Sequence, residues 1–67
     1  MIIKLTNATE EFFGNKVLIN PRYIVAVYNT TDKDGSLKTF IYTATQVTYE
    51  VCEGVDKIYE MVEECSK

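Results

Sequence analysis

The side chains that could carry catalysis in this sequence are carboxylates, hydroxyls and two cysteines, because the chain contains no histidine. Without histidine neither a Ser-His-Asp triad nor a Cys-His pair can form. Paired carboxylates stand one helical turn apart at Asp56, Glu60 and Glu64. A general acid needs a desolvated carboxyl with a raised pKa, whereas these three fall on the outward face of an expected helix. The sequence therefore predicts a protein that is not an enzyme.

The spacing of potential ligands does not indicate a metal or cofactor site. Cys52 and Cys65 stand thirteen positions apart, and a structural zinc site needs about four Cys or His ligands. Residues 32–35 resemble the start of a calcium loop without its closing glutamate, so we interpret them as a turn. The three glycines are isolated and form no phosphate-binding loop. We expect no metal and no cofactor. We expect the cysteines to be small apolar packing residues, with a disulfide between them as the alternative.

The bulk composition predicts one folded domain over residues 1–67. The chain is 46% hydrophobic and 25% charged, with ten acidic and seven basic residues and a net charge of −3. This balance is typical of globular domains and disfavours duplex DNA or an anionic membrane as a partner. The pattern of a signal peptide and an apolar run of about 20 residues are both missing. The expected location is the cytoplasm.

The elements that would position these residues begin with two short strands, at 2–6 and 16–19, and the second ends in a bend at Asn20-Pro21. Between them, Phe12 and Phe13 precede a Gly-Asn pair that is typical of a turn. We interpret one phenylalanine as a core residue and the other as packing over a sheet edge. The alternative is an exposed docking site formed by both rings.

Three more strands are predicted in the middle of the chain. Residues 23–28 are apolar on both faces, which is typical of a central strand covered on both sides. A hairpin turn at Asp34-Gly35 leads to a strand over 37–43, which also has two apolar faces. Residues 46–51 alternate cleanly and predict a strand with one buried face.

The C-terminal segment predicts one amphipathic helix that begins near Glu53 or Gly54. We interpret its acidic side as a solvated face, and docking of a basic partner is the alternative. The apolar stripe comprises Val55, Ile58, Tyr59, Val62 and Cys65, which Met61 could widen.

Together these elements predict an α+β fold. Four or five antiparallel strands would form a meander, which could curl toward a barrel, with the C-terminal helix packed across one face. The strand side chains expected under this helix are Val47, Tyr49 and Val51. A second apolar face is then left without a cover, which either a barrel-like curl or a second subunit would supply. The candidate interface residues are those of this face, Ile24, Ala26, Tyr28, Phe40 and Tyr42, together with Tyr23.

Several segments share a pattern with one known family. They are Ile3-Lys4-Leu5-Thr6, Leu18-Ile19-Asn20-Pro21 followed by Ile24 and Val27, Thr39-Phe40-Ile41-Tyr42, and Tyr49-Glu50-Val51-Cys52-Glu53-Gly54-Val55. On these residues the chain resembles the FlbD-like family of small flagellar-operon and phage-type proteins. It departs from the family in a longer segment over 7–16 and in Gly54, where the family usually has serine. The resemblance implies a small protein of unassigned activity and carries over no site residues.

The function that these patterns favour is a non-enzymatic interaction or structural module. We expect it to form a homo-oligomer through an apolar sheet face or edge, or to receive an unidentified protein partner there. The alternative is a small regulator that binds single-stranded nucleic acid through an aromatic and basic sheet face. That face would comprise Arg22, Lys38, Phe40 and Tyr42.

Overall fold

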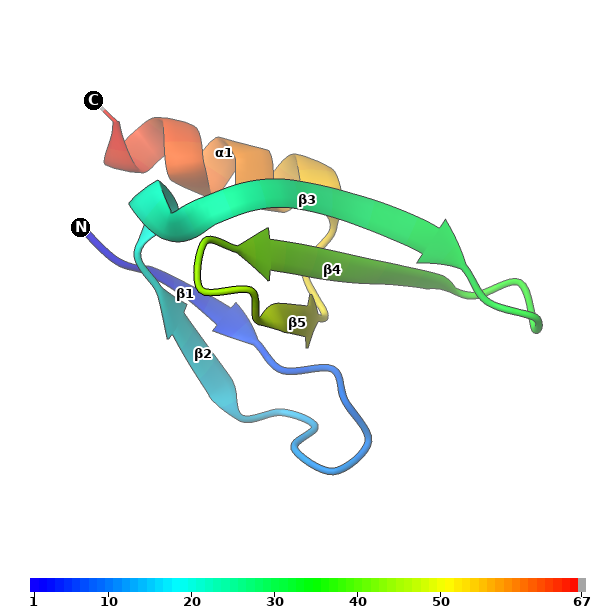
Figure 1. Ribbon diagram of the computed structural model, residues 1–67. Helices are drawn as coiled ribbons and strands as arrows, with labels where there is room; N and C mark the ends of the chain where they lie inside the picture. The colour runs from blue at the N-terminus through cyan, green and yellow to red at the C-terminus, as the bar shows by residue number, and fades with distance from the viewer. Residues whose placement is uncertain (67) are drawn as a thin grey trace.

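The computed structural model describes residues 1–66 and has the predicted α+β fold, with antiparallel strands and one C-terminal helix (Figure 1). In chain order the elements are β1 (Ile3–Thr6), β2 (Lys16–Ile19), the 3-10 helix η1 (Pro21–Tyr23), β3 (Ile24–Thr31), β4 (Leu37–Thr43), β5 (Thr48–Val51) and α1 (Val55–Cys65). β2 and β4 have the predicted bounds. β1 and β5 begin one and two residues later than expected. β3 begins one residue later than expected and extends to Thr31.

The strands form two antiparallel sheets that meet at one corner. β1 pairs with β2, and β3, β4 and β5 form a meander in that order. The sheets touch where the chain leaving β1 passes the end of β5: Asn7 bridges Val51, and the backbone N–H of Cys52 donates to the Thr6 carbonyl at 2.8 Å. Within residues 1–66 the strands do not close into a barrel.

The core lies between the two sheets and α1. Its buried side chains come from four strands and the helix: Ile3, Leu5, Ile19, Ile41, Val51 and Ile58. Tyr49 and Val62 pack against this cluster as predicted. A core of six buried apolar side chains is small, as expected for a chain that buries only about 60% of its unfolded surface.

Two residues predicted to be covered are exposed. Val47 is 43% exposed because it closes the turn before β5, where its carbonyl accepts the backbone N–H of Thr43 at 3.0 Å. Tyr59 is 65% exposed because it follows Ile58 by one position, so its side chain is rotated about 100° around the helix axis from the buried Ile58 side chain. Met61 packs on the core in its place.

The prediction that residues 23–28 form a central strand is wrong. β3 lies at the edge of its sheet, and among the described residues it pairs only with β4. The register shifts between Ile24 and Ala26, which marks a β-bulge. Because of the shift, Ile24 and Val27 both pack against the core, while Ala26 and Tyr28 point the other way.

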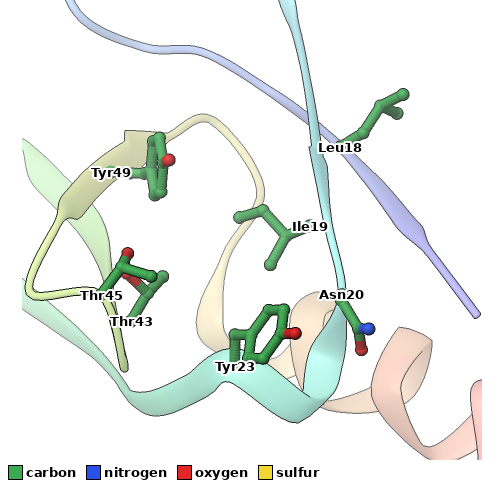
Figure 2. Close-up of a pocket in the computed structure, with 7 residues that line it drawn as sticks. All are labelled: Leu18, Ile19, Asn20, Tyr23, Thr43, Thr45 and Tyr49. Carbon is green, nitrogen blue, oxygen red and sulfur yellow. The ribbon is translucent and has the colours of Figure 1, made fainter.

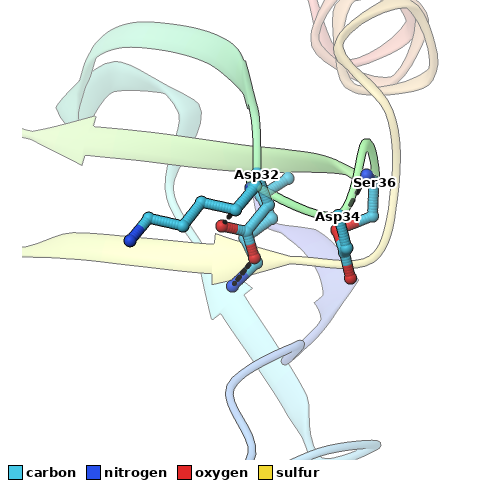
Figure 3. A network of polar contacts seen from close by, with 5 residues as sticks. Asp32, Asp34 and Ser36 are labelled. Carbon is cyan, nitrogen blue, oxygen red and sulfur yellow. Dashed lines mark hydrogen bonds and ion pairs between the residues drawn. The ribbon is translucent and has the colours of Figure 1, made fainter.

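The β3–β4 hairpin extends beyond β5 as a two-stranded arm (Figure 1). The predicted turn lies at its tip, where Gly35 has a φ of 86°. The Oδ1 atom of Asp34 accepts the Ser36 hydroxyl at 2.6 Å and the Ser36 backbone N–H at 2.9 Å (Figure 3). These bonds, the hydroxyl first, lower the pKa of Asp34. The tip is therefore ordered by its own side chains without a core behind it.

The β1–β2 loop closes on itself and leaves both of its phenylalanines exposed. The backbone N–H of Gly14 donates to the Asn7 carbonyl at 2.9 Å, and that of Asn15 donates to the Phe12 carbonyl at 3.0 Å. Phe12 is 51% exposed and Phe13 is 70% exposed. The interpretation of one ring as a core residue is wrong, because the loop lies beyond the end of the two paired strands.

Candidate interaction surface

The most distinctive surface of the molecule is the side of the β3–β4–β5 sheet that faces away from the core. Side chains alternate between the two sides of a strand. Since Thr39, Ile41 and Thr43 are buried, the residues between them face outward. The register then places Ala26 opposite Tyr42 and Tyr28 opposite Phe40. We call these four residues, Ala26, Tyr28, Phe40 and Tyr42, the outer aromatic face.

A stacked ring pair forms the centre of the outer aromatic face. The ring centroids of Tyr28 and Phe40 are 5.7 Å apart with an interplanar angle of 26°. Tyr28 remains 44% exposed and Tyr42 37% exposed, while Phe40 is half-buried. Such offset pairs contribute about 0.5–1.5 kcal/mol beyond the area they bury. The pair thus holds two rings in fixed positions while leaving apolar surface open to solvent.

Charged side chains of opposite sign border this face. Lys38 precedes Phe40 by two residues on β4, and Glu50 on β5 stands directly opposite Phe40. The Lys38 ammonium lies 3.3 Å from Asp32 Oδ2. Its hydrogen bond with Asp32 and the Asp32 charge raise the pKa of Lys38, and Glu50 adds to the effect. The outer aromatic face is therefore bordered by the cation Lys38 where the arm begins and by the anion Glu50 on β5. We call these two charges its charged rim.

Four of the six candidate interface residues are brought together, and two are not. Ile24 packs against the core because the β-bulge turns it inward. Tyr23 lies in η1 and is 57% exposed. Nothing in the local sequence distinguishes a bulged strand from a regular one here, so the alternation of residues 23–28 alone assigned Ile24 to the wrong side.

Tyr23 belongs instead to a shallow cleft between β2, η1 and the β4–β5 turn (Figure 2). The cleft has a volume of about 200 Å³, and small-molecule sites usually occupy about 300 Å³ or more. None of the described residues that line it is charged, and the Thr43 hydroxyl donates to the Val47 carbonyl at 2.9 Å. Its lining residues are Leu18, Ile19, Asn20, Tyr23, Thr43, Thr45 and Tyr49.

The basic residues of the alternative nucleic-acid face are separated. Arg22 lies in η1, which precedes β3, whereas Lys38 pairs with Thr30 near the other end of β3. Lys38 is engaged by Asp32, and Glu50 adds a negative charge opposite Phe40. A single-strand platform needs cations beside its exposed rings. This arrangement supplies the rings without a cationic groove among the described residues.

The cysteines and carboxylates do not assemble into a chemical centre in residues 1–66. No group of three or more His, Cys, Asp or Glu side chains is placed to hold a metal ion in that part of the chain. Both thiols are free. Cys65 packs against the core as predicted, but Cys52 is exposed and its Sγ atom contacts the Asn7 carbonyl at 3.7 Å. The expectation of an apolar packing role is therefore wrong for Cys52.

Within residues 1–66 no helix is long enough and apolar enough to cross a lipid bilayer. In comparisons with known proteins, the chain matches no family model, no curated protein and no solved structure.

Proposed function

We propose that this chain is a small, non-enzymatic interaction module that self-associates through the outer aromatic face. The observation that supports the proposal is the stacked pair of Tyr28 and Phe40 on a sheet face that lies opposite the core. Tyrosine and phenylalanine are enriched in protein interfaces, where rigid rings bury large areas at little entropic cost.

The small core supplies a physical reason for a partner. Among residues 1–66 only six apolar side chains are buried, and the cysteines there form no disulfide that would compensate. Chains of this size often gain stability from disulfides, metals or oligomerisation. Covering the outer aromatic face with a second copy would add apolar burial that α1 does not provide, because α1 packs on the other side of the sheet.

The free edge of β3 is a second surface that could receive a chain. The strand has eight residues, Ile24–Thr31, without a charge or a proline. Natural edge strands are usually protected by such residues. The bulge near Ile24 protects only its first part. Pairing through this edge is therefore the principal competitor to pairing through the face.

The proposal is tested by sedimentation velocity over about 5–500 µM protein, a range that brackets micromolar association. We expect a concentration-dependent dimer for the natural chain. The double variant Tyr28→Ser/Phe40→Ser should sediment as a monomer while circular dichroism shows a folded chain. Tyr59→Ser is the matched control, because Tyr59 is an exposed aromatic residue on α1, and this variant should still dimerise. A natural chain that is monomeric throughout would overturn the proposal, as would a folded double variant that still dimerises.

Binding of single-stranded nucleic acid is the alternative that the stacked rings alone favour. Fluorescence anisotropy with a labelled oligonucleotide at about 50 mM salt tests it, because electrostatic binding is strongest at low salt. We expect no binding, since the cations are separated and one is paired with Asp32. Salt-dependent binding that the Tyr28→Ser/Phe40→Ser variant loses would favour the alternative.

A further inference from the structure

We propose that two copies dock face to face about a twofold axis, with Lys38 of each subunit opposite Glu50 of the other. This inference depends on the proposed function and specifies the geometry of the same surface. It is distinct from pairing through the free edge of β3, because it requires charged residues of β4 and β5 to meet across the interface.

The chain exposes more surface than a compact monomer of its size. Its exposed area is 4878 Å², whereas a monomeric protein of 7.7 kDa is expected to expose about 4,300 Å². Docking that covered roughly 550 Å² per chain would remove this excess. An interface of about 1,100 Å² for the pair would be at the lower end of specific interfaces.

The two charges lie on either side of the outer aromatic face. Glu50 stands across from Phe40, and Lys38 precedes Phe40 by two residues on the neighbouring strand. The line from Lys38 to Glu50 therefore runs diagonally across the face, and the Tyr28–Phe40 stack lies beside its midpoint. The other outward residues of these strands, which carry no charge, are Ala26, Thr30, Tyr42 and Thr48.

A twofold contact must be self-complementary, because the same patch is used by both subunits. Consider a twofold axis that lies in the plane of the interface and crosses the Lys38–Glu50 line at its midpoint, at a right angle. Rotation about this axis places Lys38 of each subunit opposite Glu50 of the other. The same axis brings the two Tyr28–Phe40 stacks against each other. A single operation thus satisfies both the apolar centre and the charged rim of the face.

Both charges have capacity to bind a further group. An ammonium group has three donors, and the Lys38 ammonium makes one ion pair among residues 1–66, with Asp32. Glu50 attracts Lys38 electrostatically within the chain, but its carboxylate makes no hydrogen bond or ion pair with the described residues. The partner's charge can therefore be bound while the Lys38–Asp32 pair remains.

The test mixes two charge-reversal variants, Lys38→Glu and Glu50→Lys. Each variant alone places like charges opposite each other twice in the twofold dimer, so its self-association should weaken at least about tenfold. In the mixture, both cross-interface pairs again join opposite charges, and we expect a heterodimer about as tight as the natural dimer. Charge contacts within each chain are unchanged by mixing, so recovery reports only on contacts between chains.

Two exposed helix residues supply a matched control. Lys57→Glu and Glu60→Lys carry the same net charges as the test variants but lie on α1. Each should dimerise alone almost as the natural chain does, and mixing them should bring no comparable gain. Circular dichroism should show that all four variants fold. If a reversal prevents folding, Glu50→Gln replaces it, and the salt dependence of dimerisation should be weaker for this variant than for the natural chain.

The outcomes separate this inference from the proposed function. Weakened variants whose mixture recovers support the face-to-face geometry. A natural dimer that the charge reversals leave unchanged, or variants whose mixture does not recover, would overturn the geometry while self-association stands. The backbone N–H of Asn29 lies on the free edge of β3, because bonded and non-bonded pairs alternate along the hairpin from the bonded pair Asp32–Ser36. Loss of the dimer in Asn29→Pro without sensitivity to charge would therefore indicate pairing through this edge and would also overturn the geometry. A natural chain that is monomeric at every concentration would overturn both.

Discussion

Glu53 accepts two hydrogen bonds from Thr6, one on each carboxylate oxygen, although the two residues are 47 positions apart in the sequence. We call this pair of bonds the Thr6–Glu53 clasp. The Thr6 backbone N–H donates to Oε1 and the Thr6 hydroxyl donates to Oε2, each at 2.9 Å. The contact ties the end of β1 to the segment that connects β5 with α1. It therefore joins the two sheets at the corner where Asn7 also bridges Val51.

We expect Glu53→Gln to lower the free energy of unfolding by about 1 kcal/mol at neutral pH, since a half-exposed, charge-assisted hydrogen bond is weakened. Urea denaturation monitored by circular dichroism measures the change. Glu10→Gln is the control, because Glu10 is exposed in the β1–β2 loop and its replacement should cost less than about 0.5 kcal/mol. An equal effect of both replacements would contradict a specific role of the clasp.

The same contact predicts a pH dependence of stability. Burial by itself raises the pKa of Glu53, but the hydrogen bonds from Thr6, with help from Lys16, hold it below its ordinary value of 4.5. The unfolded chain therefore takes up a proton at Glu53 before the folded chain does, and stability rises with pH through this range. The contribution is complete above the ordinary pKa and is lost as the pH falls through the lower, folded pKa. The difference between the natural chain and Glu53→Gln should accordingly shrink in acid.

Adjacent residues of α1 should respond very differently to truncation. Ile58 is 1% exposed and Tyr59 is 65% exposed. Ile58→Ala should cost about 2–4 kcal/mol, because it leaves a cavity between α1 and the sheets. Tyr59→Ala should change stability by less than about 0.5 kcal/mol. Thermal and urea denaturation of the two variants decide the point, and a large cost at Tyr59 would show that the helix is rotated from the described orientation.

The two loop phenylalanines should be dispensable for folding. Phe12 and Phe13 are both more than half exposed, so the double variant Phe12→Ser/Phe13→Ser should lose less than about 1 kcal/mol of stability. Differential scanning calorimetry measures the change in melting temperature. A loss comparable to that of Ile58→Ala would restore the interpretation of one ring as a core residue.

Replacement of glycine by serine should raise the stability of the chain at one position and lower it at another. Gly54 is the N-cap of α1, with extended backbone and no side-chain cap, so Gly54→Ser should stabilise the chain by a few tenths of a kcal/mol. Gly14 has a φ of 90°, and Gly14→Ser should destabilise it by about 1 kcal/mol through backbone strain. Open space surrounds both positions. Chemical denaturation of the pair should therefore give opposite signs, and two changes of the same sign would contradict these backbone assignments.

The sequence predicted the elements of this fold well where the residue types within a short segment determine the local structure. The strand over 37–43 was predicted from its run of apolar residues. The turn at Asp34-Gly35 was predicted because glycine tolerates a positive φ. Asn20-Pro21 predicted the bend at η1, where the Asn20 side chain accepts the Arg22 backbone N–H at 3.0 Å. The clasp between Thr6 and Glu53 could not be predicted, because neither residue belongs to a local motif that indicates the other.

The candidate surface was predicted in part. The aromatic residues Tyr28, Phe40 and Tyr42 were identified because alternation in two neighbouring strands places them on one side. Ile24 was assigned to the wrong side, since a single bulged residue inverts the alternation on one side of it. The position of β3 at the edge of the sheet was also missed. Apolar residues on both faces of a strand indicate that both faces are covered, and they do not indicate whether both of its edges are paired.

The sequence by itself determined the α+β class, most strand bounds, the helix and the absence of histidine-based chemistry, because these depend on residue type and periodicity. Only the tertiary structure decided that Ile24 faces the core, that Tyr59, Phe12 and Phe13 remain in solvent, and that Lys38 and Glu50 border one aromatic face. Those outcomes depend on register and on the packing of segments far apart in the chain, which no short window of residues contains.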